Sequence, residues 1–188
     1  AFAQDAAPAA QQGGLEEIIV TAQKRAEGLS DVPISISAIS GKQVENYGQT
    51  NLEQISSSVP NLKITQTAIA NRIAIRGIAS GDNKGFEQSV AMFVDGVYYG
   101  RDQLSRLPLV DMERVEVLRG PQPTLFGKNA IAGAVNITTR SPTDEFEGSV
   151  SGLYEFNHKE FQLTGVLSGP LSDGIEARVV GYHRSMDG

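Results

Sequence analysis

The stretch Val115-Glu-Val-Leu-Arg-Gly-Pro-Gln122, followed by Gly133-Ala-Val-Asn-Ile-Thr-Thr139, decides the fold of this chain. Both segments are short runs of β-branched and aliphatic residues bounded by glycine or proline, which is typical of strands in a sheet. Gly120-Pro121 ends the first run, because proline lacks a backbone donor and restricts the residue before it. The pattern therefore predicts strands over residues 115–119 and 133–139.

Shorter strands are predicted upstream of this pair. The expected ranges are 62–66, 72–76 and 90–94. Asp95-Gly96 follows the last of them and is a strong signal for a two-residue hairpin turn. Residues 31–39 alternate between apolar and small polar side chains, as in a half-buried strand, and Pro33 indicates a position at the sheet edge.

Two short helices are predicted between the strand at 31–39 and the strand at 62–66. Ser40 and Gln43 have the spacing of a capping box, and this helix is expected to stop at Gly48. Thr50 and Glu53 repeat the same spacing at the start of a second helix. Together with the strands, these helices predict an α+β domain built on a small mixed sheet.

Composition excludes several classes of function. The chain has 188 residues, 16 Lys and Arg against 22 Asp and Glu, and no cysteine. A net charge of −6 argues against nucleic acid as a partner, and the lack of cysteine removes disulfides and thiolate metal sites. His158 and His183 lie among acids near strand ends, where solvated side chains are favoured over a metal site. We see no catalytic constellation and expect no enzyme activity, no metal and no cofactor.

The first 25 residues are predicted to form a linker and a tether. Ala1-Phe-Ala3 fits the end of a secretory signal, and residues 1–14 have too few apolar side chains to order, so a signal-peptide remnant and disordered linker are expected. Residues 15–25 contain the β-branched run Ile18-Ile-Val-Thr21 between charged residues. This run suits strand addition to another protein, or equally the first strand of the following sheet.

Beyond residue 144 apolar and polar side chains alternate in three successive segments. The first segment places these residues on one face: Phe146, Gly148, Val150, Gly152, Tyr154 and Phe156. Leu153 is an exception on the polar face, and turn signals follow at Asn157-His158 and Ser172-Asp-Gly174. Strands of about 10 residues suit an outer-membrane barrel, but a soluble antiparallel sheet with one wet face gives the same pattern.

These motifs, taken in order, resemble the plug of TonB-dependent outer-membrane receptors. The matching segments are Glu17-Ile-Ile-Val-Thr-Ala-Gln-Lys-Arg25, residues 31–39, Ile75-Arg-Gly77, Val94-Asp-Gly-Val-Tyr98, residues 115–122 and residues 125–137. The resemblance implies a TonB box and tether over 15–25, a plug domain over 26–143, and the first strands of a truncated outer-membrane β-barrel over 144–188. It also implies localisation in the outer membrane, with the N-terminus reaching the periplasm.

By resemblance, the protein imports a scarce ligand, most often a ferric siderophore, with energy from TonB of the inner membrane. The residues expected to bind TonB are Glu17, Ile18, Ile19, Val20, Thr21 and Ala22. Arg76 and Arg119 are expected to latch the plug to glutamates of the barrel wall, with exposed strand ends as the alternative. Ligand-facing apices are expected at Ser80, Asp82, Asn83, Lys84, Tyr98, Tyr99 and Arg101. The competing interpretations are a soluble periplasmic binding or signalling module with a plug-like fold, and a hydrolase.

Overall fold

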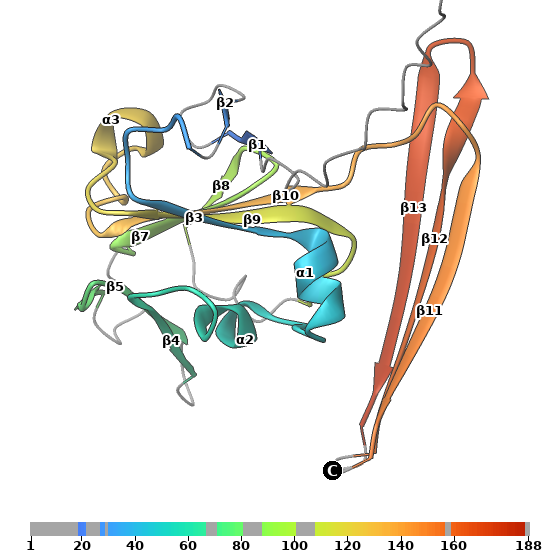
Figure 1. Ribbon diagram of the computed structural model, residues 1–188, viewed down its shortest axis with the longest axis horizontal. Helices are drawn as coiled ribbons and strands as arrows, with labels where there is room; N and C mark the ends of the chain where they lie inside the picture. The colour runs from blue at the N-terminus through green and yellow to red at the C-terminus, as the bar shows by residue number, and fades with distance from the viewer. Residues whose placement is uncertain are drawn as a thin grey trace, which may run out of the picture.

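A mixed five-stranded sheet lies at the centre of the computed structural model, and three long strands stand beside it (Figure 1). The strand order is β3-β9-β10-β7-β8, in which β10 and β7 run parallel and the other neighbours run antiparallel. The strands are β3 (Ile36–Ser40), β7 (Val90–Val94), β8 (Val97–Tyr99), β9 (Met112–Arg119) and β10 (Gly133–Thr139). The structure describes residues 19–21, 27–28, 30–66, 71–80, 88–100, 108–156 and 159–186.

The sheet confirms most of the predicted strands. β7 and β10 have the predicted bounds, whereas β9 begins at Met112 rather than Val115. The segment after Pro33 forms β3 at one edge of the sheet, as a proline near its start predicts. Asp95 and Gly96 join β7 to β8 with φ angles of 48° and 78°, which are the left-handed values that a two-residue hairpin turn needs.

Helix α1 (Gly41–Asn46) begins at the predicted capping box. Gln43 donates its backbone N–H to Ser40 Oγ at 3.3 Å, and Ser40 donates its own to Gln43 Oε1 at 3.2 Å. The helix ends at Asn46, and Gly48 follows with a φ of 61°. Glycine adopts this conformation without the steric cost that a Cβ brings, so the chain can turn away here.

Helix α2 (Leu52–Ser56) begins one residue later than the second predicted capping box implies. The N-cap is Asn51, whose Oδ1 accepts the backbone N–H of Gln54 at 2.9 Å. Thr50 lies before the cap, and its backbone N–H donates to Gln54 Oε1 at 2.6 Å. Asparagine is as good an N-cap as serine and a better one than threonine. The prediction from the Thr50–Glu53 spacing therefore named the wrong N-cap residue. None of the described helices is long and apolar enough to cross a membrane.

A smaller antiparallel sheet and both helices cover one face of the central sheet (Figure 1). Its strands are β4 (Leu62–Gln66), β5 (Asn71–Ile75) and β6 (Ile78–Ala79). The main core lies between the layers and includes Val44, Leu52, Ile55, Leu62, Ile64, Ile73, Ile75, Met92, Val115, Val117, Val135 and Ile137. These aliphatic side chains leave water on folding, which is the main stabilisation of the domain.

The opposite face of the central sheet carries less cover. A second cluster there contains Ala91, Leu118, Ala130 and Ala134, with Phe93 and Phe126 packed against it. A short helix that the sequence did not predict, α3 (Pro123–Phe126), supplies Phe126 and starts with proline at its first position. On the same side lie β1 (Ile19–Val20) and β2 (Glu27–Gly28), which pair with each other in a separate sheet (Figure 1).

The last three strands form the predicted antiparallel meander. They are β11 (Glu147–Glu155), β12 (Glu160–Ser172) and β13 (Ile175–Ser185). The outward face is apolar and exposed, with 75% of Phe146, 80% of Val150 and 61% of Leu167 accessible. The exception at Leu153 has a reason, because its side chain lies on the plug side and lines a cavity beside α1. The expected fold class, an α+β domain followed by antiparallel strands, is confirmed.

Candidate functional site

The expected TonB box lies against the central sheet where the structure describes it. Ile19 and Val20 form β1 and pair antiparallel with Gly28 and Glu27 of β2. Val20 is fully buried, while 56% of Ile19 is exposed. β1 is therefore not a strand of the five-stranded sheet, which was one of the two sequence-based expectations. Glu17, Ile18 and Ala22 lie outside the described residues.

Thr21 contacts a buried acid in the middle of β9. Its backbone N–H donates to Glu116 Oε1 at 2.7 Å, and its hydroxyl lies 3.3 Å from the same oxygen. Glu116 is fully buried, and its carboxylate also accepts Arg114 Nε at 2.8 Å and Asn136 Nδ2 at 3.1 Å. A buried carboxylate needs such donors, because losing water is costly for a charge. We name Thr21, Arg114, Glu116 and Asn136 the Glu116 cluster.

Sequence reasoning missed this cluster and assigned no functional role to Glu116. The sequence carried one signal, because Glu116 is a charged residue between the aliphatic residues of the run Val115-Glu-Val-Leu118. The structure buries all four of these residues. The structure pairs Glu116 with Asn136 across β9 and β10, so two polar residues face each other inside an apolar sheet. A charged residue at such a position is rarely buried unless other groups pair with it.

The predicted latch residues lie at neighbouring loops. Arg76 follows β5 with a left-handed φ of 53°, and its Nη1 lies 3.6 Å from where a Cβ on Gly120 would stand. Arg119 ends β9, and its Nη2 is 3.4 Å from the carbonyl of Ile36. The Nε of Arg119 is buried without a hydrogen-bond partner. Among the described residues, neither arginine forms an ion pair. Both guanidinium groups can therefore donate hydrogen bonds to an acid outside the described residues.

The expected ligand-facing residues are only partly described. Ser80 Oγ lies 2.8 Å from Ser89 Oγ and accepts the Ser89 backbone N–H at 2.5 Å. Tyr98 and Tyr99 are each 40% exposed. The Tyr98 ring packs on Phe93 at 5.5 Å, and its hydroxyl accepts the side-chain amide of Asn129. Asp82, Asn83, Lys84 and Arg101 lie outside the described residues.

Strand register and the Ser80–Ser89 contact bring Arg119 and Ser80 to one end of the central sheet, whereas Tyr98 and Tyr99 lie further along it, opposite Phe93 and Met92. Gly133 at the start of β10 stands opposite Arg119 on one side and Val90 on the other. Ser80 binds to Ser89, which directly precedes Val90. Arg119 and Ser89 are distant in sequence, and the parallel pairing of β10 with β7 places them at the same end of the sheet. Glu116 lies further along β9, opposite Asn136.

A charged network that the sequence did not predict joins this domain to the meander. Arg178 of β13 donates from Nε and Nη2 to the two carboxylate oxygens of Asp111, at 2.6 and 2.7 Å. The side chains are 10% and 6% exposed. Arg140 extends the network, with Nη1 3.7 Å from Asp111 and Nη2 2.8 Å from Glu45 of α1. The two parallel hydrogen bonds from Arg178 to Asp111 are the strongest form of an arginine–carboxylate pair.

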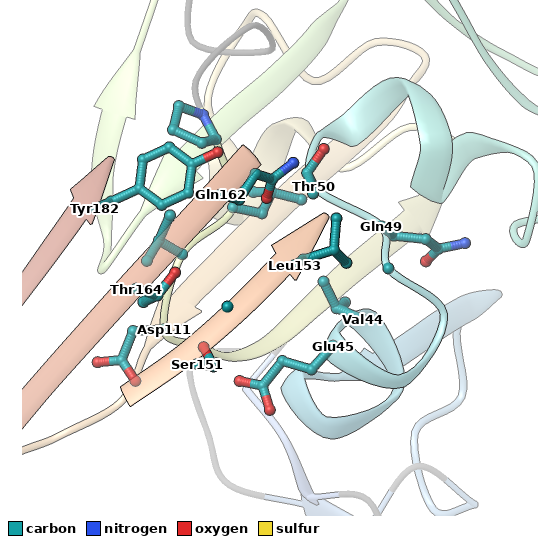
Figure 2. A pocket seen from close by; sticks show the side chains of 15 residues that line it. Val44, Glu45, Gln49, Thr50, Asp111, Ser151, Leu153, Gln162, Thr164 and Tyr182 are labelled. Atoms are coloured by element: carbon teal, nitrogen blue, oxygen red, sulfur yellow. The ribbon is translucent and has the colours of Figure 1, made fainter. Parts of the chain in front are cut away.

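A cavity of about 300 Å³ lies next to this network, between α1 and the meander (Figure 2). Figure 2 shows Gln49, Thr50, Asp111, Gln162 and Tyr182 around it. The Oε1 of Gln49 and the hydroxyl of Tyr182 are buried without a hydrogen-bond partner, so the lining is polar at these points. Within the described part of the chain, no group of three or more acids, histidines or cysteines is placed to hold a metal ion.

Comparison with known proteins gives one family and a consistent set of relatives. Residues 28–134 match the TonB-dependent Receptor Plug Domain family. The chain is 32% identical to the iron-regulated outer membrane virulence protein of Vibrio cholerae, over all of this chain and 29% of that protein. It is 31% identical to the pesticin receptor of Yersinia pestis, over 90% of this chain and 25% of that protein. The chain thus spans less than a third of the length of these relatives.

Solved structures agree with this match. The ferric yersiniabactin uptake receptor FyuA from Yersinia pestis superposes with a TM-score of 0.71 and 29% identity. The match covers 78% of this chain and 23% of that structure. It includes more of this chain than residues 28–134 alone can supply, so the similarity continues beyond the family match.

Proposed function

Because this chain belongs to the TonB-dependent receptor plug domain family, we propose that it is the plug and first wall strands of an outer-membrane receptor that imports a ferric siderophore. One observation carries the proposal: a plug-type domain continues into a meander with one exposed apolar face. The names of the relatives, an iron-regulated outer membrane protein and a ferric yersiniabactin uptake receptor, favour iron complexes as the ligand class.

The meander has the chemistry of a barrel wall. β11, β12 and β13 contain 9, 13 and 11 residues, close to the roughly 9–11 that a tilted strand needs to cross a bilayer. Phe146, Val150 and Val179 are exposed by 65% or more on the face away from the plug. A soluble periplasmic module would need a further layer over these side chains, because water does not favour a large apolar surface.

The coupling role belongs to residues 17–22. A short β-branched segment can add its backbone as a strand to TonB, and a pull along that strand then acts on the plug. The segment follows the linker of residues 1–14, belongs to the tether of residues 15–25 and precedes the plug, to which we assign residues 26–143. The burial of Val20 and the hydrogen bond of Thr21 support a force path that reaches the plug at the Glu116 cluster.

Arg76 and Arg119 latch the plug to acids of the barrel wall in this proposal. The support is the buried Nε of Arg119 and the lack of an acidic partner for either residue among the described ones. Inside a partly dry lumen, an ion pair with a carboxylate stabilises the guanidinium group. If some water reaches the pair, the pair can still be broken. The ligand then meets the outer apices, to which we assign Ser80, Asp82, Asn83, Lys84, Tyr98, Tyr99 and Arg101.

The deciding experiment removes the coupling segment from the full-length receptor. Deletion of residues 17–22 abolishes energised uptake of the ferric siderophore but leaves its binding to whole cells intact. Uptake is followed with radioactive iron, with binding measured on de-energised cells. A shortened linker, lacking residues 6–11 instead, is the matched control and retains uptake. Unchanged uptake after deletion of residues 17–22 would rule out the coupling role.

The latch has its own test. Arg119→Ala in the full-length receptor removes a guanidinium that the wall binds, so amide hydrogen exchange around Gly120 becomes about tenfold faster, as expected when one charged hydrogen bond of about 1.5 kcal/mol is lost. Arg72→Ala, at an exposed position of β5, is the control. Equal exchange in wild type and Arg119→Ala contradicts the latch.

A further inference from the structure

A polar seam runs between the plug and the face of the meander that is turned toward it. We propose that this seam is a water-filled passage for small uncharged solutes, and that the ion pair of Asp111 with Arg178 keeps the passage closed. The inference rests on the proposed function, in which β11, β12 and β13 belong to the barrel wall. It adds to that function a hydrophilic route beside the plug and the contact that blocks the route.

The seam consists of two neighbouring hollows. The first is the cavity of about 300 Å³ between α1 and the meander (Figure 2). The second is an open groove of about 560 Å³ between the end of β10 and β13. Four residues line both hollows: Pro108, Val110, Asp111 and Tyr182. The two hollows therefore adjoin each other at these residues.

The two hollows follow one another along the wall strands. The cavity reaches Gln162 of β12, whereas the groove reaches Arg178 of β13, which pairs with Ser168 of β12. Gln162 and Ser168 are six positions apart, and a strand rises about 3.3 Å per residue, so the seam extends for roughly 20 Å along the wall. Allowing for the usual tilt of barrel strands, this length is about half of a hydrocarbon core of about 30 Å.

The lining of the cavity favours water. The Oε1 of Gln49 and the hydroxyl of Tyr182 are buried with no hydrogen-bond partner among the described residues, and both belong to the lining. Thr50, Ser151 and Thr164 add hydroxyl groups around the same space (Figure 2). A buried polar atom without a partner is costly, so water that enters the cavity is bound there. One water molecule occupies about 30 Å³ in the liquid, so about 300 Å³ holds several.

The charges along the seam are balanced. Asp111 accepts two hydrogen bonds from Arg178, at 2.6 and 2.7 Å, and Arg140 lies 2.8 Å from Glu45. Two acids thus face two arginines, and every other polar side chain in the lining of the two hollows is neutral. An ion that left bulk water for this seam would meet no unpaired charge of opposite sign. The seam therefore suits water and uncharged solutes better than ions.

The pair of Asp111 with Arg178 lies where the two hollows meet. Asp111 belongs to the plug and lines both hollows, while Arg178 comes from β13 and lines the groove. Their side chains are only 6% and 10% exposed, so the pair fills the space between plug and wall. The backbone of Asp111 is also held, because its carbonyl accepts the N–H of Arg140 at 3.1 Å. With this pair in place, the cavity and the groove stay separate.

Breaking the pair should join the two hollows. Arg178→Gln has a shorter, uncharged side chain that cannot make both bonds to Asp111, so the space between cavity and groove opens. A cavity of about 300 Å³ accommodates a five-carbon sugar but is too small for a trisaccharide. The opened seam therefore discriminates between uncharged solutes by size.

The experiment measures sugar entry into liposomes that contain the purified full-length receptor. The probes are arabinose and the trisaccharide raffinose, and entry is followed by light scattering as the liposomes swell. In wild type, neither sugar enters faster than into liposomes without receptor. Arg178→Gln should admit arabinose about tenfold faster than wild type and still exclude raffinose. Asp111→Asn, which breaks the same pair from the plug side, should give the same result.

Arg184→Gln is the matched control. Arg184 lies on the same face of β13 and makes a similar two-bond pair with Glu160, at 2.7 and 2.9 Å. It lines neither the cavity nor the groove. Loss of this pair should therefore change arabinose entry by less than twofold.

A second substitution separates an open seam from a generally loosened plug. Thr164→Phe fills the cavity from β12, so the double variant of Thr164→Phe with Arg178→Gln should admit arabinose no more than twofold faster than wild type. A leak through a loosened plug would persist in the double variant and would also admit raffinose.

Three results overturn the passage: arabinose entry through the wild type, no faster entry in Arg178→Gln and Asp111→Asn, or a leak that Thr164→Phe does not reduce. Electrophoresis of unheated samples shows whether each receptor is folded in the liposomes. A wild-type receptor that never inserts refutes the proposed wall, and with it the seam. An inserted receptor with no leak in either variant refutes the seam alone.

Discussion

Single residues decide how closely the layers of the plug approach each other. Gly41, the first residue of α1, lies so near β9 that a Cβ there would stand 1.7 Å from the carbonyl oxygen of Met112. No side chain fits in that space, so glycine sets the distance between helix and sheet. Asp95 acts in a different way: its carboxylate accepts both the backbone N–H and the hydroxyl of Thr139 at 2.9 Å, tying the β7–β8 turn to β10.

The close contact at Gly41 gives a prediction. Gly41→Ala forces α1 away from β9 and lowers the free energy of opening the α1 region by about 1–3 kcal/mol, the usual cost of overpacking. Amide hydrogen exchange of α1 in the full-length receptor measures this. Gly165→Ala, where nothing lies within 4 Å of the added Cβ, should leave exchange unchanged. The explanation fails if the two variants behave alike.

The strands of the meander separate two environments by the direction of their side chains. Val150 lies opposite Gly165, and both belong to the apolar face, whereas Ser149 and Thr164 belong to the other. Because side chains alternate along a strand, one residue of offset exchanges the faces completely. The register observed here is the one in which the polar face meets the plug, where Thr164 and Gln162 line the cavity of Figure 2.

This two-faced arrangement predicts the effect of a charge. Val150→Lys places an ammonium group among lipid tails and destabilises the inserted receptor by about 2–4 kcal/mol if the position lies near the bilayer centre. Ser149→Lys, one residue earlier on the opposite face, should cost much less. The folded fraction after reconstitution, read from electrophoresis of unheated samples, compares the two. Equal losses would place Val150 away from lipid.

The whole molecule is held together by a polar joint as well as by the chain itself. The chain passes from β10 to β11 through residues 140–146, and the pair of Asp111 with Arg178 fastens the plug to β13 nearby. Here the plug supplies the acid and the wall strand supplies the arginine, the reverse of the polarity expected for Arg76 and Arg119. With Arg140 and Glu45, the joint also includes α1.

Breaking this joint should loosen the plug at α1. Arg178 is largely buried, and Asp111→Asn removes the charge that pairs with it. The expected loss is about 3–5 kcal/mol in the stability of the local contact. Arg178→Gln should have a similar effect, and the double variant should lose less than the sum, which is the sign of direct coupling. Hydrogen exchange of α1 in the full-length receptor provides the readout, with Asp173→Asn in the exposed β12–β13 turn as control. Strictly additive losses contradict the joint.

Much of the fold was predictable because its signals are local. The bounds of β4, β7 and β10, the turn at Asp95-Gly96 and the box at Ser40 each follow from a few adjacent residues. The errors are also local: Asn51 rather than Thr50 caps α2, since two good capping residues stand side by side. The short helix α3 carried too weak a signal to predict.

The candidate site was less predictable, because it depends on contacts between distant residues. Sequence alone determined most of the elements, the apolar face of the meander and the family resemblance, all of which lie in patterns of neighbouring side chains. Only the tertiary structure decided that Thr21 meets Glu116 across 95 positions and that Asp111 meets Arg178 across 67. Such pairs carry no periodicity along the chain, and packing alone determines which charge meets which donor.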